Sequence, residues 1–269
     1  MTAAVKRPFS LPIYLFIVCT VSWPFQIAFA VLGDGYRPVL LISMVMAGVG
    51  TWVAGRLVFN DGFQEAGWRL GSARFYFLAI SLALLLWLFP VAIELLLGIN
   101  SLSPDFRVQT LLQALLISVL LTVLPAFGEE FSWRGYLLPK LLERYTKRQA
   151  LLLHGFITWF WHLPFLVTLG LDLESSTIVS VTAVLLISIV PATMHAIVFA
   201  WFWAKSGSLF VATFYHVAFD EVRDSLQESI GFAWIAENWQ MLVLTLLGLF
   251  FVWRTDWCKV NVPKEHDDH

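Results

Sequence analysis

The chain has 269 residues and a formal net charge of −2, with 59% hydrophobic and only 13% charged residues. Soluble domains carry about 25% charged residues. This composition, with a mean hydropathy of +0.76, therefore excludes an ordinary water-soluble domain. The near-neutral charge gives no reason to expect a nucleic acid or another polyanion as a partner.

Apolar runs follow one another along almost the whole chain, at residues 11–32, 38–59, 75–98, 107–138, 150–171, 178–204, 208–229 and 234–253. A helix that spans a bilayer needs about 20 mostly apolar residues, and most of these runs meet that length. We therefore expect an all-α, polytopic membrane protein of about eight transmembrane helices. The last two runs are the weakest, because the seventh becomes polar at DEVRDSLQES and the eighth has a short apolar centre.

The first run also resembles a signal peptide, since Lys6 and Arg7 precede it and the small residues AFA lie near its end. It is long enough to span a bilayer, however, and further apolar runs follow it. We expect it to remain as an uncleaved first helix.

The basic residues predict how the spans are oriented. Eight spans place both termini on one side, and most basic residues fall on that side: Lys6, Arg7, Arg56, Arg69, Arg74, Lys140, Arg144, Lys147, Arg148, Lys205, Arg254, Lys259 and Lys264. Arg37, Arg107 and Arg223 fall on the other side, where the loop GLDLESS adds Asp172 and Glu174. Short basic loops stay in the cytoplasm, so both termini are expected to be cytoplasmic.

Ionisable residues interrupt three of the runs at a similar depth. At a rise of 1.5 Å per residue, Glu129, His162 and His216 lie roughly 15 to 18 Å from the cytoplasmic ends of their helices. Ionisable groups inside a membrane are costly, rare and usually functional. We therefore expect these side chains to converge on one polar cavity in the cytoplasmic half of the membrane.

Two pairs of polar residues also have a purely structural explanation. Glu130 and Arg134 are four residues apart, so an ion pair along one helix face would account for both. His216 and Asp220 have the same spacing, and a hydrogen bond between them is an adequate account. Glu129 differs from these residues. If Glu130 pairs with Arg134, the Glu129 carboxylate has no obvious partner nearby in the sequence.

The remaining histidines and the two cysteines carry weaker signals. His195 is expected to pack against the site or support it, whereas His154 lies nearer the membrane interface and is expected to be solvated. Cys19 lies in the first apolar run and Cys258 in the polar tail, so no disulfide between them is expected.

Three ordered motifs carry a resemblance to a known family. EEFSWR fits E-E-x-x-x-R, TWFWH supplies a second-motif histidine, and HVAFD fits H-x-x-x-N/D. In this order they resemble the CPBP family of CAAX proteases and bacteriocin-processing enzymes, also called the Abi family. WHLP and SGSLFVATFYH are also similar to segments of many bacterial members. We therefore expect residues 1–104 to supply N-terminal transmembrane helices, 105–225 the catalytic core, and 226–269 the last helix and tail, all in one integrated membrane domain.

The resemblance implies an intramembrane endopeptidase of the plasma membrane (the inner membrane in bacteria), which cuts a peptide bond near the cytoplasmic face. It implies Glu129 as general base, with His162 sharing the attacking water. It also implies that His216 and Asp220 face the scissile carbonyl oxygen. It implies a supporting role for Glu130 and Arg134, which would hold the helix in place and keep the Glu129 carboxylate correctly oriented.

Two departures from the family pattern bear on the chemistry. Thr158 stands where an aromatic residue usually precedes the second-motif histidine, and Asp220 stands where well-studied members have Asn. An ionised Asp cannot donate a hydrogen bond to an oxyanion. Asp220 must therefore be protonated, bind a metal or orient His216, and we expect Asp220→Asn to be active.

The cofactor and the function class remain open. A Glu, two His and an Asp form a plausible Zn²⁺ ligand set, but H-E-x-x-H is absent and we favour a metal-free mechanism. The expected partners are the lipid bilayer and a peptide or membrane-protein substrate: a prenylated C-terminus, a leader peptide or a membrane protein. The alternative is a non-catalytic immunity, scaffold or transport protein that uses the same cluster for binding.

Overall fold

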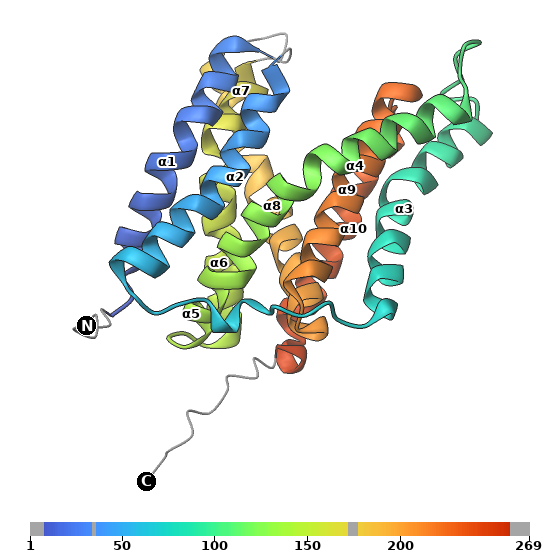
Figure 1. Cartoon of the computed structure of the whole chain (residues 1–269). Coiled ribbons are helices and arrows are strands. Elements are labelled where there is room, and N and C mark those ends of the chain that lie inside the picture. Colours follow the sequence, from blue (N-terminus) through green and yellow to red (C-terminus); the bar gives the residue numbers. More distant parts are fainter. Residues whose placement is uncertain (1–7, 34–35, 172–176, 259–269) are drawn as a thin grey trace.

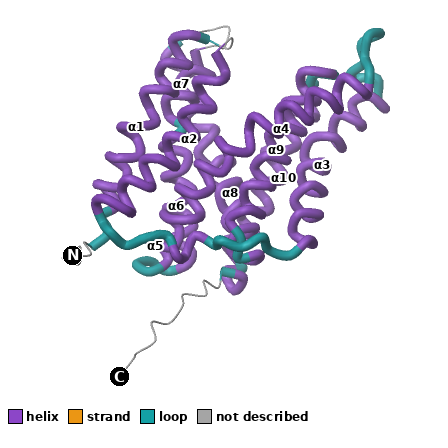
Figure 2. The backbone as a smooth tube through the Cα atoms, in the orientation of Figure 1, coloured by secondary structure: helices purple, strands orange, loops and turns teal. Residues whose placement is uncertain are grey.

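The computed structural model describes residues 8–33, 36–171 and 177–258, and the regular elements in these ranges are all helices (Figures 1 and 2). Most are α-helices, η2 and η4 are π-helices, and η3 and η5 are 3₁₀-helices. In chain order they are α1 (Leu11–Leu32), α2 (Arg37–Val53), η2 (Ala54–Val58), η3 (Gln64–Ala66), α3 (Ala73–Leu96), α4 (Val108–Glu130), η4 (Phe131–Leu137), α5 (Leu138–Leu142), α6 (Lys147–Trp161), α7 (Leu163–Leu171), α8 (Ile178–Ser206), α9 (Leu209–Ser229), α10 (Trp234–Trp253) and η5 (Thr255–Trp257). Six residues used in the orientation prediction lie outside the described ranges: Lys6, Arg7, Asp172, Glu174, Lys259 and Lys264.

The structure confirms an all-α, polytopic membrane protein, with helices that begin and end close to the expected runs. In the described residues, 6 helices are long and apolar enough to cross a membrane, or up to 7 with the bent pair α6–α7. The expected count of about eight also included α9, which is not among these spans because its second half is polar. α9 packs against α3, α4 and α8, and Glu221 and Ser225 of its polar half are buried in the protein.

Glu129, Glu130 and Arg134 lie on one long helical segment. α4, η4 and α5 form a continuous span of 35 residues from Val108 to Leu142. At 1.5 Å per residue this is about 50 Å, well over the roughly 30 Å of a hydrocarbon core. The segment must therefore tilt, in agreement with its diagonal course in Figure 1. Within it, the π-helical turns of η4 directly follow Glu129 and Glu130, and such turns are frequent at functional sites.

Gly128 brings α2 and α4 into close contact just before the two glutamates. A Cβ atom at Gly128 would lie 2.7 Å from the carbonyl oxygen of Met44. A Cβ at Gly48 would lie 3.0 Å from the Cα of Gly128. Small residues at helix crossings let backbones approach closely in membrane proteins. This crossing fixes the part of α4 that carries Glu129 and Glu130 against α2.

Contacts between loops place both ends of the described chain on the same side of the protein. Arg144, after α5, donates a hydrogen bond to the Phe9 carbonyl oxygen at 2.6 Å. Arg148, at the start of α6, donates to the Trp253 carbonyl oxygen at 3.1 Å. Figure 1 likewise shows the start of α1 and η5 at one end of the molecule. Two ends on one side require an even number of membrane crossings. The apolar helices and the bent pair α6–α7 give up to 7 crossings in the described residues, and α9 supplies one more.

Candidate active site

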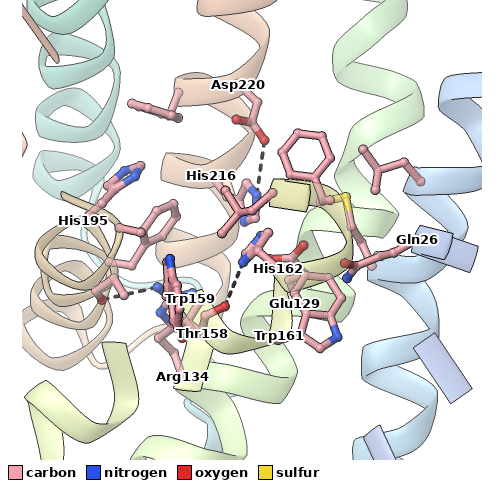
Figure 3. Close-up of a pocket in the computed structure, with 18 of the residues that line it drawn as sticks. Gln26, Glu129, Arg134, Thr158, Trp159, Trp161, His162, His195, His216 and Asp220 are labelled. Atoms are coloured by element: carbon pink, nitrogen blue, oxygen red, sulfur yellow. Dashed lines mark hydrogen bonds and ion pairs between the residues drawn. The ribbon is translucent and has the colours of Figure 1, made fainter. Parts of the chain in front are cut away.

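A cavity of about 310 Å³ lies between the helices, and ionisable side chains from several of them line it (Figure 3). The rest of its wall is apolar and aromatic, so charges inside it are poorly screened by water. The structure brings together all four residues expected to be catalytic. The polar and ionisable residues of the lining are Gln26, Glu129, Arg134, Thr158, His162, His195, His216, Asp220 and Arg223.

The two consecutive glutamates have different surroundings. Glu130 is completely buried, and its Oε1 accepts hydrogen bonds from Arg134 Nη1 and His216 Nδ1, each at 2.9 Å. The expected ion pair between Glu130 and Arg134 is thus confirmed. Glu129 lines the cavity, and its carboxylate makes no hydrogen bond to another described residue. Glu130 therefore joins α4 to α9, while Glu129 is available to a ligand.

Arg134 is held in place by three different contacts. Besides its bond to Glu130, its Nη2 donates to the Ala196 carbonyl oxygen at 3.3 Å. Its guanidinium lies 4.4 Å from the ring centre of Phe199, within the range of a cation–π interaction. These contacts link η4 to α8 and keep the positive charge beside the cavity.

His162 lies at the break between α6 and α7, where the helix axis bends by 55°. Its Nδ1 is 2.8 Å from the carbonyl oxygen of Thr158, one turn earlier. A carbonyl oxygen only accepts, so Nδ1 carries the hydrogen and Nε2 keeps its lone pair in the neutral ring. The partner is a backbone atom, so this bond does not depend on which side chain stands at position 158.

His216 lies between two carboxylates. Its Nδ1 is 2.9 Å from Glu130 Oε1, and its Nε2 is 3.2 Å from Asp220 Oδ2, as the i,i+4 spacing of the second pair predicts. When both ring nitrogens of His216 carry hydrogens, each of the two carboxylates accepts a hydrogen bond from the ring. The bond to Glu130 was not anticipated from the sequence, because it joins residues on helices far apart in the chain.

Asp220 has both of its carboxylate oxygens engaged by donors. Oδ2 faces His216 Nε2, and Oδ1 is 3.0 Å from Arg223 Nη1. Arg223 also donates from Nε to Asp224 at 2.7 Å. An oxygen that carried the proton would face another donor, so this geometry disfavours a protonated Asp220. Among the three roles left open by the sequence, it favours the orientation of His216.

Two further histidines have different surroundings. His195 lines the cavity, with its Nε2 at 3.2 Å from the Tyr215 hydroxyl and its ring 4.3 Å from that of Phe219. These contacts agree with the expected packing or supporting role. The prediction that His154 is solvated is wrong. It is completely buried, and its Nε2 lies 3.2 Å from the Trp133 carbonyl oxygen, because α6 packs against η4 at this point.

The residues do not fit a metal site in this arrangement. Within the described ranges, no group of three or more His, Cys, Asp or Glu side chains is placed to hold a metal ion. In the Zn²⁺ set considered from the sequence, both nitrogens of His216 face carboxylates, so neither is available as a ligand. The two cysteines are free, as expected, and both are buried.

Gln26 is a lining residue that the sequence reasoning missed. It enters the cavity from α1, outside the three motifs, and it is completely buried. A glutamine within an otherwise apolar span is an unusual polar residue, and that signal was available from the sequence.

The fold and this buried cluster define an integral membrane protein with an ionisable site inside its helix bundle. Residues 110–222 match the sequence model of the family described as Type II CAAX prenyl endopeptidase Rce1-like. This match agrees with the resemblance that the three motifs carry. No curated protein matches the chain.

Proposed function

We propose that this protein is an intramembrane endopeptidase in which Glu129 and His162 activate a water molecule for attack on a peptide bond. One observation carries the proposal. The Glu129 carboxylate and His162 Nε2 line the same largely apolar cavity, and neither makes a hydrogen bond to another described residue. The family match over residues 110–222 supports proteolysis as the reaction class.

In the proposed reaction, water lies between Glu129 and His162. One of its hydrogens points to the Glu129 carboxylate and the other to His162 Nε2, which leaves an oxygen lone pair for the substrate carbonyl carbon. As the C–O bond forms, Glu129 takes the proton from water. It then passes this proton to the nitrogen of the scissile bond, and the C–N bond breaks.

The negative charge that develops on the carbonyl oxygen needs a donor. We assign this role to His216 Nε2–H, whose bond to Asp220 is the longer of its two, at 3.2 Å against 2.9 Å to Glu130. The hydrogen would be shared between the oxyanion and Asp220. Glu130 would keep the ring in place while this happens.

The proposed orientation places the cut near the cytoplasmic face of the plasma membrane, the inner membrane in a bacterium. Support comes from the described basic residues in the loops and helix ends on the side where α1 starts and α10 ends, since short basic segments stay in the cytoplasm. These residues are Arg56, Arg69, Arg74, Lys140, Arg144, Lys147, Arg148, Lys205 and Arg254.

The proposal is tested with the full chain reconstituted in liposomes. Two probes are supplied, a prenylated CAAX peptide and an unprenylated leader-type peptide, and mass spectrometry identifies the products. We expect one probe to be cleaved with the addition of one water, and a chelator to leave the rate unchanged. Loss of activity on chelation, with recovery on addition of Zn²⁺, would contradict the metal-free mechanism.

A non-catalytic role is the alternative for the same cluster. In that case, neither probe would be cleaved, and Glu129→Gln protein would still bind its partner. Peptides that co-purify with Glu129→Gln therefore serve a second purpose. If active wild-type protein cleaves them, they identify the substrate class. If it leaves them intact, the cluster serves binding only.

A further inference from the structure

The cavity contains a polar side chain that the proposed chemistry does not use. Gln26 of α1 is 0% exposed and points toward Glu129 and His162 (Figure 3). Neither its amide nitrogen nor its amide oxygen has a hydrogen-bond partner among the described residues. Buried amides are almost always hydrogen-bonded, because an unpaired one loses its interactions with water without replacement. Gln26 is thus equipped to bind a ligand.

Gln26 belongs to a buried row on α1. Tyr14, Val18, Ser22 and Gln26 are each four residues apart and each 0% exposed. The Tyr14 hydroxyl donates to the Ser132 carbonyl oxygen at 3.0 Å, and Ser22 Oγ accepts from the indole N–H of a tryptophan at the end of α6 at 2.8 Å. The polar residues before Gln26 in the row therefore have partners in η4 and α6, whereas Gln26 has none among the described residues.

The position of Gln26 is fixed by contacts next to His162. Ser22 accepts from Trp161 Nε1, and Trp23 Nε1 donates to the Trp161 carbonyl oxygen at 2.9 Å. Trp161 immediately precedes His162 in the chain. Two hydrogen bonds thus hold α1 against the bend that presents His162, and one turn later on α1 Gln26 reaches the cavity. A side chain held in this way is preorganised for a ligand.

The chemistry of the carboxamide indicates which ligand it would bind. It offers one donor and one acceptor side by side, and a backbone peptide group offers the complementary pair. An anion would use only the donor and would be repelled by Glu129, while a cation would use only the acceptor. The imidazole donors of the proposed catalytic residues are engaged, since His162 Nδ1 faces Thr158 and both nitrogens of His216 face carboxylates.

We propose that Gln26 binds a backbone peptide group of the substrate beside the scissile bond. Its Nε2–H donates to a substrate carbonyl oxygen, and its Oε1 accepts from a substrate N–H. This inference rests on the proposed function. Gln26 lies outside residues 110–222, so the family match does not account for it. It makes α1 a part of the substrate site as well as a membrane anchor.

Gln26→Met tests the proposal, because methionine keeps the length of the side chain and removes both hydrogen-bonding groups. With the prenylated CAAX peptide or the leader-type peptide, whichever is cleaved, we expect KM to rise about tenfold for the lost hydrogen bonds. Gln26→Asn keeps the carboxamide on a shorter side chain, and its KM should lie between that of the wild type and that of Gln26→Met. The matched control is Gln113→Met, which makes the same change at an exposed glutamine of α4 and should leave KM unchanged.

Thermal unfolding separates this role from a structural one and needs no substrate. Because Gln26 has no hydrogen-bond partner among the described residues, Gln26→Met should have a Tm equal to or above that of the wild type. A lower Tm, or an unchanged KM, would overturn the inference. If wild-type protein cleaves neither peptide, the proposed function fails. If the wild type cleaves and Gln26→Met cleaves equally well, only the role of Gln26 fails.

Discussion

His216 lies between Glu130 and Asp220, and this arrangement changes the role that the sequence suggests for Asp220. The expectation that Asp220→Asn stays active assumed a protonated acid that an amide could replace. In the structure, Asp220 instead accepts from His216 on one oxygen and from Arg223 on the other. An ionised carboxylate satisfies two donors at once, and an amide, with one oxygen, cannot.

We therefore predict that Asp220→Asn lowers kcat/KM by about 10- to 100-fold. In either orientation of the amide, its NH₂ group faces another donor, at His216 or at Arg223. One lost hydrogen bond to a charged group costs about 1.5–3 kcal/mol. Steady-state cleavage kinetics measure the effect, and Asp220→Ala, which removes both acceptors, should be at least as impaired.

Arg223→Met provides a control for this explanation. Without the guanidinium, the Asn oxygen can turn to His216 while its NH₂ faces no competing donor. The double variant Asp220→Asn/Arg223→Met should therefore regain part of the lost activity relative to Asp220→Asn. Full activity of the single Asn variant would restore the hypothesis that Asp220 acts as a hydrogen-bond donor.

Among the helices, the α2–α4 crossing at Gly128 closely constrains the position of Glu129. A side chain there would meet the backbone of Met44, which cannot move without shifting α2. Gly128→Ala should lower the free energy of unfolding by about 1–3 kcal/mol, as overpacked core sites do. It should also lower kcat, because Glu129 is the next residue. Thermal unfolding and cleavage rates measure the two effects.

Gly135→Ala is the matched control on the same helical segment. Its Cβ would lie 3.3 Å from the side chain of Ala66, a contact that a small shift relieves. We expect a much smaller change in Tm than for Gly128→Ala. Equal effects at both glycines would contradict the importance of the crossing.

The helices could be predicted largely from the sequence, whereas their irregularities could not. A run such as Leu11–Leu32 is long and apolar, and the bilayer thickness alone fixes its length. Although Pro164 gives a local reason for the bend at His162, hydropathy encodes neither this bend nor the π-helical turns after Glu130. His154 was misplaced for this reason, because its burial comes from η4 rather than from its distance to the interface.

The site was predictable where its residues lie one turn apart or belong to a motif. Glu130–Arg134 and His216–Asp220 follow from i,i+4 spacing. The bond between Glu130 and His216 joins α4 to α9, so it requires the tertiary arrangement. Gln26 reaches the cavity from a helix with no motif, and only the structure places it there.

For the molecule as a whole, the arrangement predicts which loops face the cytoplasm. Ser103, before α4, and Glu143, after α5, are both exposed and lie at opposite ends of the long α4–α5 segment. In intact cells, an impermeant maleimide should label Ser103→Cys, and it should label Glu143→Cys only after permeabilisation. The reverse pattern would contradict the orientation proposed from the basic residues.

The native cysteines should not interfere with this measurement. Burial raises the pKa of Cys258 to about 11, so its thiol stays protonated at a labelling pH of about 8. Cys19 lies within a span and is also buried. Wild-type protein should therefore remain unlabelled when folded, and it serves as the baseline for both variants.

The central claim is that the buried cluster carries hydrolytic chemistry, with Glu129 as the base. Glu129 and Glu221 are equally buried, each 4% exposed, but only Glu129 is among the residues that line the cavity. The most direct measurement compares peptide cleavage by Glu129→Gln and Glu221→Gln at equal amounts of folded, reconstituted protein. We predict a loss of at least about 100-fold for Glu129→Gln, as expected for a missing general base, and near wild-type rates for Glu221→Gln. Cleavage by folded Glu129→Gln at the wild-type rate would contradict the account.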